Sequence, residues 1–303
     1  MKYDNPEDII QITPLWTGER FANGRPKVPD DILRRMRRIT LEEAWSPIWR
    51  RGYDFQFQGG FQTVHPNMTV VGRAVTAVFA PERPDLNDAL LKYGQEEEHR
   101  KGFFNQWVID SLVEDDVVVV DMFDKVYKGT FVGGNLTTAI STRTKRGGAV
   151  VWGGMRDVQQ VEKIANVNVY HRGIDPTPIR QVTMLGMNVP CRIGNAICLP
   201  GDVVMATPMG VLFIPPHLAE LAVVLAEKSQ VRDVFGFERL AEGKYTTADI
   251  DGDWPVALWE DFLHWFRTSD KAADYQSLAW EEELQEARER ERSGEAPGNT
   301  PRA

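Results

Sequence analysis

The chain has 303 residues, of which 42% are hydrophobic and 26% are charged, and this composition is ordinary for a soluble globular protein. Its length allows one large domain or two modest ones. The formal net charge of −9 argues against a sequence-wide surface for nucleic acid or anionic membranes.

Nothing in the sequence predicts export or membrane insertion. The acidic start MKYDNPEDII lacks the apolar core of a signal peptide. No apolar run approaches the ~20 residues that a membrane-spanning helix needs. Cys191 and Cys198 lie in an apolar stretch without a CxxC motif or a Cys/His cluster, which favours buried free thiols. We therefore expect a cytoplasmic protein with no nucleic-acid or membrane partner.

The first patterned segments are an arm and a helix. Residues 17–31, TGERFANGRPKVPDD, are rich in Gly, Pro and charge, which predicts an extended arm. Residues 29–52 carry apolar side chains at helical spacing, and Asp30 or Asp31 is the predicted N-cap.

From Thr69 the pattern alternates between strand and helix. Short β-branched runs at 69–80, 114–123, 149–155 and 167–173 predict buried strands, with helices expected over 133–148 and 156–165. Residues 181–194 continue the alternation, and residues 200–216 predict a β-hairpin with a Pro-Met-Gly turn. Residues 217–244 predict an amphipathic helix that breaks near Gly236. This order indicates an α/β domain with added ends.

The segment GGAVVWGGMRDVQQ, residues 147–160, is the main candidate for chemistry. An apolar strand gives way to a glycine pair and then to Arg156 and Asp157. Asp157 has two interpretations: it caps the next helix, or it binds a hard divalent cation. An Arg fork beside it suits a substrate carboxylate. The setting favours a ligand site, because ligands of α/β sheets bind beyond the carboxyl ends of strands.

A second glycine pair precedes this segment. Gly133 and Gly134 stand at the start of a predicted helix, whose free N–H groups would face the same crevice and bind a carboxylate or an oxyanion. Asp121 ends the run VVVVD and is either a strand-end acid in that crevice or the partner of a neighbouring loop. The five histidines show no zinc-site spacing, and no P-loop, GxSxG elbow or Rossmann fingerprint occurs.

The ordered segments VVVVD, GGNL, GGAVVWGGMRD, VYHRG, NVPCRIGN and PGDVVMATPMGVLFIP resemble the RraA-like family over roughly residues 41–243. That family includes the regulator of ribonuclease activity A and the class II 4-hydroxy-4-methyl-2-oxoglutarate aldolases, which also decarboxylate oxaloacetate. The arm at 12–31 and the segment FERLAEGKYTTADID indicate a longer subgroup.

The resemblance implies an α/β fold, a β/β/α swivelling-domain-type sandwich, with helical N- and C-terminal extensions. It divides the chain into an arm and helix start (1–40), an RraA-like catalytic domain (41–243), an aromatic helical extension (244–280) and a charged, mobile tail (281–303). It also implies a homotrimer or a homohexamer of two trimers. The aromatic extension, with Trp254, Trp259, Phe262, Trp265 and Phe266, either adds to the intersubunit contact or packs on its own body.

The same resemblance assigns roles by position. Arg156 would hold the carboxylate of a 2-oxo acid, and Asp157 would bind Mg²⁺ or Mn²⁺ largely through ordered waters. The backbone N–H groups of a substrate loop would hold the pyruvyl end, and an acid from a neighbouring subunit would touch a metal-bound water. The loop consists of Gly134, Asn135, Leu136 and Thr137, and the acid is Glu238 or Glu242.

Three positions depart from the aldolase pattern. Asn135 stands where the aldolases carry a loop acid, Gln160 where they carry Glu or Asp, and Thr207 where many relatives have Asp. Because an Asn cannot take a proton at neutral pH, either Asp121, a metal-bound hydroxide or another acid is the base, or the reaction differs.

We therefore expect a metal-dependent carbon–carbon lyase, an aldolase or decarboxylase, that acts on a small 2-oxo acid. In it, the metal and Arg156 would stabilise a pyruvate-enolate-like intermediate. Two alternatives stay open. One is a different metal-dependent enzyme on the same scaffold, such as a hydratase, eliminase or hydrolase. The other is a non-catalytic regulatory protein that binds a partner.

Overall fold

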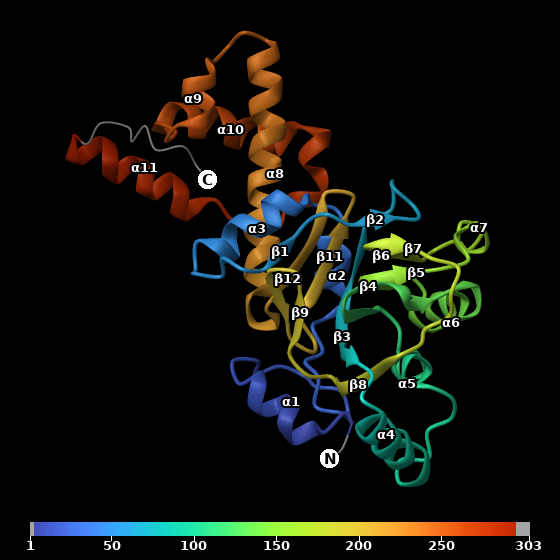
Figure 1. Ribbon diagram of the computed structural model, residues 1–303. Helices are drawn as coiled ribbons and strands as arrows, with labels where there is room; N and C mark the ends of the chain where they lie inside the picture. Colours follow the sequence, from blue (N-terminus) through green and yellow to red (C-terminus); the bar gives the residue numbers. More distant parts are fainter. Residues whose placement is uncertain (1–2, 295–303) are drawn as a thin grey trace. The chain divides into compact units, whose positions relative to one another are not determined.

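The computed structural model describes residues 3–294, which form two compact units. The first unit contains residues 3–41 and 48–220, and the second contains residues 42–47 and 221–294. Figure 1 labels the helices and strands of both units. No helix of the described residues is both long and apolar enough to cross a membrane.

The first unit is built on a ten-stranded mixed sheet. Its main path runs β1 (Phe57–Gln58), β12 (Gly210–Ile214), β11 (Val203–Thr207), β3 (Val70–Pro81), β4 (Asp116–Val132), β5 (Gly148–Met155), β6 (Asn168–His171) and β2 (Gln62–Thr63). Off this path, β7 (Gly173–Ile174) pairs with β5, and β8 (Val182–Met187) pairs with β3. The central strands β3, β4, β5 and β6 are parallel, so the carboxyl ends of β4 and β5 lie at the same edge.

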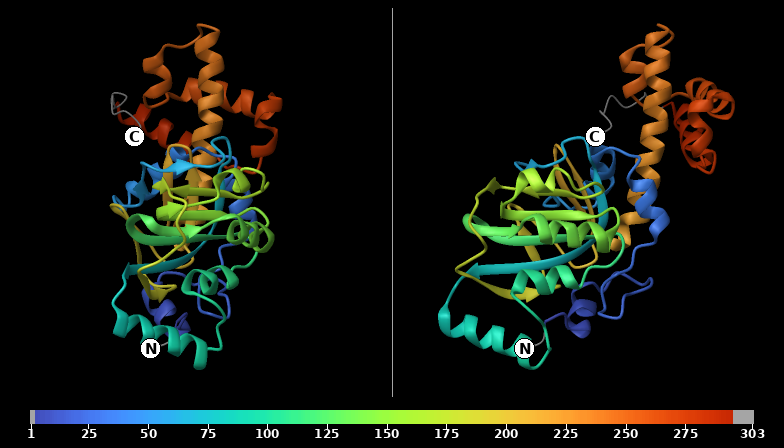
Figure 2. Two further views of the ribbon diagram at one scale, coloured as in Figure 1. Left: turned by 45° about the vertical axis from the view of Figure 1, so that its right-hand side comes forward. Right: turned by 90° about the vertical axis from the view of Figure 1, so that its right-hand side faces the viewer.

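The alternation of side chains along the β-branched strands gives the sheet two apolar faces. In β4, Val118 and Val120 join a core with the helices α4 (Pro84–Glu96), α5 (Phe104–Asp110), α6 (Gly134–Thr144) and α7 (Val158–Val161). Val117 and Val119 instead join a core with the hairpin β9 (Cys191–Ile193) and β10 (Ala196–Cys198). Figure 2 shows α5 and α6 beside the long strands. This layering of hairpin, sheet and helices confirms the predicted β/β/α sandwich.

Local features of this unit match most of the sequence pattern. The hairpin of β11 and β12 pairs Thr207 with Gly210 and so turns at Pro208-Met209, as predicted. Both cysteines are free and buried, as expected. The helix expected over 156–165 is short, because α7 covers only Val158–Val161.

Before the sheet, α1 (Pro6–Ile12) leads into the arm, which ends at α2 (Asp30–Met36). The N-cap of α2 is Pro29, so the expected Asp30 or Asp31 cap is wrong. Asp30 instead pairs with the buried guanidinium of Arg73. A second helix, α3 (Leu41–Trp49), follows separately.

The second unit is a helical cluster around aromatic side chains. It is formed by α8 (Ala219–Ala241, after the short helix η1, Pro216–Leu218), α9 (Thr247–Asp251), α10 (Val256–Thr268), η2 (Asp270–Tyr275) and α11 (Glu281–Ser293). Contrary to the expected break, α8 continues through Gly236. A Cβ on Gly236 would lie 2.7 Å from Ile250 Cγ2, so the glycine serves close packing rather than a kink.

The aromatic rings of α10 are buried inside this unit. Phe262 is completely buried, and it contacts Phe235 of α8 and Trp280 at ring-centroid distances of 5.4 and 4.7 Å. Trp254, Trp259, Trp265 and Phe266 are each at most 6% exposed. The rings therefore pack on their own body, and the alternative of intersubunit burial by these side chains is wrong.

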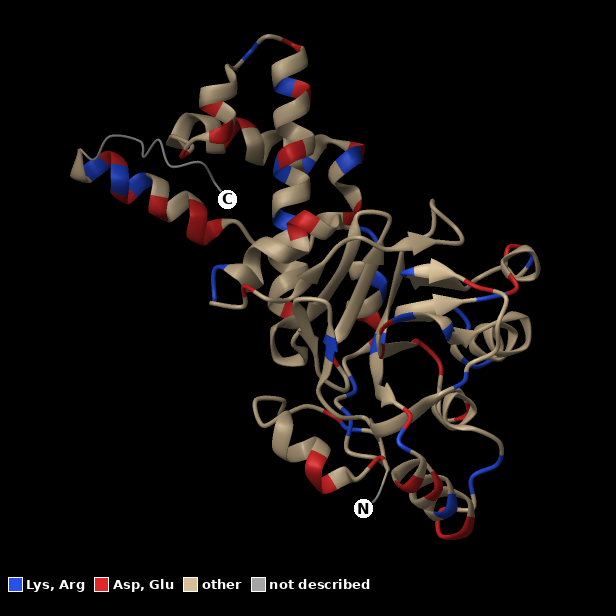
Figure 3. Ribbon diagram, viewed as in Figure 1, with Lys and Arg blue, Asp and Glu red and all other residues tan. Residues whose placement is uncertain are grey.

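The compact units divide the chain differently from the sequence-based boundaries. The sheet unit ends at residue 220, inside α8, whereas the sequence placed the end of the catalytic domain at residue 243. Residues 281–293, expected to belong to a mobile tail, form α11, whose first turn is acidic and whose last turn contains Arg290 and Arg292 (Figure 3). That order complements the helix dipole. The rest of the expected tail, residues 295–303, lies outside the described residues.

Candidate active site

The candidate site lies where β4 and β5 end side by side. Val132 and Met155 are paired at the ends of the two strands, and the N–H of Arg156 donates to Val132 O at 3.0 Å. Gly133 and Gly134 follow β4 and begin α6, while Arg156 and Asp157 follow β5 and precede α7. Both predicted junctions therefore meet at one edge of the sheet.

The glycine pair allows a close approach that no side chain would permit. A Cβ on Gly133 would overlap Asp157 Oδ2 and lie 3.0 Å from Arg156 Cγ. A Cβ on Gly134 would overlap Gln160 Oε1. The start of α6 is thus in contact with three polar side chains of the next junction, which explains why the two positions are glycines.

Asp157 is held in a conformation that serves this contact and not the capping of α7. Its backbone is left-handed, with φ 58°, which is uncommon for a residue other than glycine. Its side chain accepts no capping hydrogen bond from α7. Instead, Asp157 Oδ2 accepts from Gly134 N at 3.2 Å, at the start of a different helix. Asp157 thus occupies the predicted N-cap position of α7, but its side chain caps the start of α6 and not that of α7.

Arg156 and Asp157 form a loose and accessible ion pair. Arg156 Nη1 lies 3.6 Å from Asp157 Oδ2, and the two side chains are 39% and 29% exposed. A pair of this kind contributes little to stability. Its geometry leaves most of the guanidinium donors of Arg156 available to a ligand carboxylate.

The first turn of α6 adds donors beside this pair. In the described part of the chain, the N–H groups of Asn135 and Leu136 have no backbone acceptor, as is usual for a first helical turn. Asn135 is exposed, whereas Thr137 is fully buried and its Oγ1 has no hydrogen-bond partner. The positive end of the helix dipole therefore faces the Arg-Asp pair, and an anion is the complementary ligand.

Comparison with known proteins fits this geometry. The family model described as RraA-like, Aldolase/RraA, matches residues 43–213, which is more than half of the chain. The chain belongs to the RraA-like family. A search of curated proteins finds no match.

Solved structures share the fold of this chain. RraAS2 of Streptomyces coelicolor, described as an unusual member of the RNase ES inhibitor RraA protein family, has 22% identity and a TM-score of 0.57. That match covers 70% of this chain and 97% of the other. An uncharacterized protein from Pseudomonas syringae pv. tomato str. DC3000 has 18% identity and a TM-score of 0.59, covering 76% of this chain and 96% of the other.

Among the RraA-like site residues expected from the sequence, Asp121 is not brought to the strand ends. It pairs with Val78 and Trp152 within the sheet, and β4 continues past it to Val132, so Asp121 does not end the strand. Its Oδ1 accepts from Phe123 N at 2.8 Å, which matches the alternative of a loop partner. Burial raises the pKa of the Asp121 carboxyl, and this hydrogen bond and Arg192 oppose the rise.

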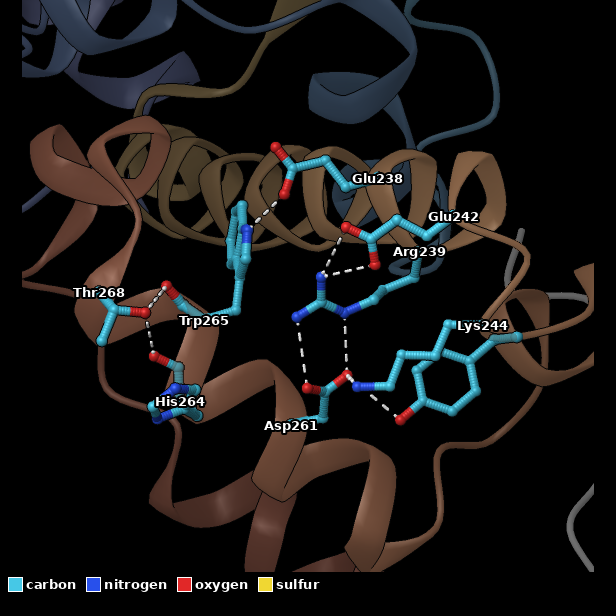
Figure 4. Close-up of polar contacts among 9 residues, drawn as sticks. Glu238, Arg239, Glu242, Lys244, Asp261, His264, Trp265 and Thr268 are labelled. Carbon is cyan, nitrogen blue, oxygen red and sulfur yellow. Dashed lines mark hydrogen bonds and ion pairs between the residues drawn. The ribbon is translucent and has the colours of Figure 1, made fainter.

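Glu238 and Glu242 are engaged within the helical unit, as Figure 4 shows. Glu238 accepts from Trp265 Nε1 and forms an ion pair with Lys271, both at 2.5 Å. The hydrogen bond from Lys271 is the main reason why the pKa of Glu238 is lowered. Glu242 pairs with Arg239 at 3.1 Å and stays 54% exposed, so it is the more accessible of the two.

The donor set at the strand ends fits only a cation that keeps most of its water. Among residues 3–294, no group of three His, Cys, Asp or Glu side chains is arranged to hold a metal ion. Asp157 offers one carboxylate, and Gln160 Oε1 lies against the same helix start. Mg²⁺ is commonly held by one or two carboxylates with several waters, so the site suits Mg²⁺ or Mn²⁺ and not a fully protein-coordinated metal.

The position of Gln160 and the orphan hydroxyl of Thr137 could not be read from the sequence. Gln160 stands three residues after Asp157, which is a helical spacing and the only signal that the side chain returns to the glycine pair. The resemblance placed Thr137 in the substrate loop, but nothing in the sequence indicated that its side chain is completely buried.

Proposed function

We propose that this RraA-like protein is a divalent-metal-dependent lyase that acts on a small 2-oxo acid, with decarboxylation as its best-supported reaction. The observation that carries the proposal is the hydrogen bond from Gly134 N to Asp157 Oδ2 beside the accessible Arg156. It puts a guanidinium, a carboxylate and a helix N-terminus within one substrate length of each other.

Side chains and backbone N–H groups of the site bind different parts of the substrate. Arg156 binds one carboxylate of the 2-oxo acid through two parallel hydrogen bonds. The N–H groups of Asn135 and Leu136 orient the oxygens of the pyruvyl end at the start of α6. Asp157, with Gln160 beside it, would hold Mg²⁺ or Mn²⁺, which supplies Lewis-acid stabilisation of negative charge on the substrate oxygen.

The residues present favour decarboxylation over aldol cleavage. Aldol cleavage needs a base to remove the proton of the substrate hydroxyl. In this chain Asn135, which is not a base, stands where the aldolases carry the loop acid. Loss of CO₂ from a 3-carboxylate needs only an electron sink next to the breaking bond. The proton that ends the reaction can come from water, because Arg156 and Asp157 are partly exposed.

The test measures pyruvate release from oxaloacetate with Mg²⁺ or Mn²⁺, corrected for the reaction of the metal alone. We expect Asp157→Ala to lower kcat/KM at least ~100-fold, because the cation loses its carboxylate. Glu162→Ala removes an exposed carboxylate five residues away and is the matched control, with unchanged turnover expected. Equal turnover by the wild type and Asp157→Ala would reject the assignment.

A second candidate, a metal-dependent hydratase, eliminase or hydrolase, is favoured by the same missing acids at Asn135 and Gln160. A third, a regulatory protein, is supported by the description of the Streptomyces relative as part of an inhibitor family. A thermal-shift panel with Mg²⁺, Mn²⁺, pyruvate and oxalate separates them, because a ligand that binds the native state raises its Tm. Metal-dependent stabilisation by oxalate supports the lyase, and no response to any ligand favours the regulator.

The oligomeric state belongs to the same proposal. A homotrimer or hexamer would bring Glu238 or Glu242 of one subunit to the Arg-Asp pair of the next. Glu242 is the better candidate, since Glu238 is held by Trp265 and Lys271. Light scattering measures the assembly, and Glu242→Gln tests the contribution of this acid to turnover.

A further inference from the structure

The sheet unit contains a cavity of about 270 Å³ that shares no lining residue with the Arg-Asp site. Its walls come from the arm after α1, the segment after α3, the end of the β9–β10 hairpin and the chain around η1. Most of the lining is apolar, and Leu15, Trp16, Ile197 and Leu199 are representative. An apolar cavity with a few convergent polar groups is the usual form of a small-molecule site.

Asp202 gives this cavity one exceptional polar group. The residue is 2% exposed, and the only hydrogen bond that its side chain accepts in the described part of the chain comes from Leu199 N at 2.7 Å. Burial raises the pKa of Asp202 to about 8. A buried carboxyl of this kind is costly to ionise unless a cation accompanies it.

Two other buried acids of the same unit show how the fold normally meets this cost. Asp116 is bound by both Nη atoms of Arg25 at 2.9 Å. Asp115 accepts from Arg37 Nη2 at 2.7 Å. No cation of residues 3–294 forms an ion pair with Asp202, although it lines a cavity that is large enough for a ligand.

The other polar groups of the lining are already engaged or uncharged. Tyr53 and His217 share a hydrogen bond of 3.2 Å, and burial lowers the pKa of His217, which keeps its imidazole neutral at pH 7. Gln56 Nε2 donates to Ile197 O and Phe213 O. The lining therefore contains no positive charge that would compete for the Asp202 carboxyl.

We propose that this cavity binds a primary amine carried on an apolar body, with the ammonium paired to Asp202. The rings of Trp16 and Tyr53 line the same cavity and suit a cation or an arene. The volume limits the ligand to a small molecule, about the size of a phenylalkylamine.

The affinity of the cavity for an amine should depend on pH. The titratable groups of the lining are Asp202, His217 and Tyr53. Because Asp202 is protonated below pH 8, pairing with an ammonium releases one proton. The affinity should therefore rise about tenfold per pH unit between pH 6 and pH 8. A neutral ligand of the same shape would bind without this dependence.

The experiment is a calorimetric titration of the full chain with 2-phenylethylamine and with 2-phenylethanol, its uncharged analogue of similar size. We expect saturable binding of the amine, at least tenfold tighter than the alcohol at pH 8. Asp202→Asn keeps an acceptor for Leu199 N but loses the charge, so it should weaken amine binding at least tenfold and leave alcohol binding unchanged.

Two further variants distinguish binding in the cavity from binding at the surface of the protein. Ile197→Trp adds bulk to the lining of the cavity and should abolish binding, while Leu185→Trp changes another exposed strand residue outside the lining and should not. Equal affinity for amine and alcohol, amine binding unaffected by Asp202→Asn or by Ile197→Trp, or no saturable binding would overturn the proposal. None of these results depends on metal or on Asp157.

Discussion

The two ends of the parallel strands use arginine and aspartate in opposite ways. At the amino end of β4, Arg25 from the arm forms two hydrogen bonds of 2.9 Å with Asp116, and the two side chains are 3% and 0% exposed. At the carboxyl end of β5, Arg156 and Asp157 are 3.6 Å apart and partly exposed. The same pair of residue types is thus closed at one edge and open at the other.

This difference indicates that the closed edge stabilises the fold, whereas the open edge is available for function. The amino edge is covered by the arm, where Phe21 lies 4.6 Å from the guanidinium of Arg25 and Arg73 donates to Val28 O at 2.7 Å. Both Nη groups of Arg25 donate to Asp116, although the buried Arg25 Nε has no hydrogen-bond partner. At the carboxyl edge, the left-handed Asp157 and the first turn of α6 keep donors and acceptors available. The open edge differs from the closed one because its guanidinium and its first-turn N–H groups are available to a ligand, and groups left available in this way are typical of a functional site.

The largest expected effect is at the closed edge. Arg25→Ala leaves the Asp116 carboxylate buried without a cation, so we expect a loss of about 3–5 kcal/mol in the free energy of unfolding, measured by urea denaturation. Arg83→Ala removes an exposed partner of Asp85 and should leave the free energy of unfolding almost unchanged. A loss below ~1 kcal/mol in Arg25→Ala would show that the arm does not lock this edge.

A smaller effect, which depends on pH, is expected at Asp202. Its pKa is about 8 in the folded chain and near 4 in the unfolded chain, so between these values the unfolded chain releases a proton that the folded chain keeps. Stability due to this group is therefore present below pH 4 and is lost as the pH rises towards 8.

Asp202→Asn removes this dependence. Relative to the wild type, we expect the variant to gain up to about 2.7 kcal/mol between pH 5 and pH 7, which is at most ~1.4 kcal/mol per pH unit. Urea denaturation at several pH values measures the gain. Parallel pH profiles of the two proteins would show that Asp202 is ionised in the fold.

The sequence was sufficient for the open edge but not for the closed one. Glycine pairs and an Arg-Asp pair at successive strand-to-helix junctions predict convergence, because parallel strands end at one edge. Arg25, in contrast, is separated from Asp116 by 91 positions and lies in a segment of irregular backbone. No periodicity connects two such residues, so only the folded arm reveals the pair.

Asp121 shows the converse limit of sequence reasoning. The run of valines before it is typical of a strand that ends at a polar residue, yet β4 continues to Val132 through register shifts after Asp121 and Lys125. Bulges of this kind depend on the positive φ angles of Phe123, Asp124 and Lys128, none of which is a glycine. The sequence around Asp121 therefore did not predict that the strand continues.

The most direct comparison of the edges comes from one substitution made at each, and the smallest expected change in stability is that of Gly134→Ala. Gly147 stands at the amino edge, where a Cβ would overlap the backbone oxygen of Asp116 and lie 2.6 Å from Thr144 Oγ1. Because a backbone atom cannot move aside, Gly147→Ala should lower the free energy of unfolding by about 1–3 kcal/mol in urea denaturation.

At the open edge, the new Cβ of Gly134→Ala would lie against the flexible end of Gln160. The residue is the first of a helix, where alanine is favoured, so the free energy of unfolding should change by less than ~1 kcal/mol. The displaced Gln160 stands beside Asp157, so pyruvate release should nevertheless fall at least fivefold in Gly134→Ala. If both variants lost stability equally and Gly134→Ala kept full turnover, the glycine pair would serve packing alone, as Gly147 does. The open edge would then not be the active site.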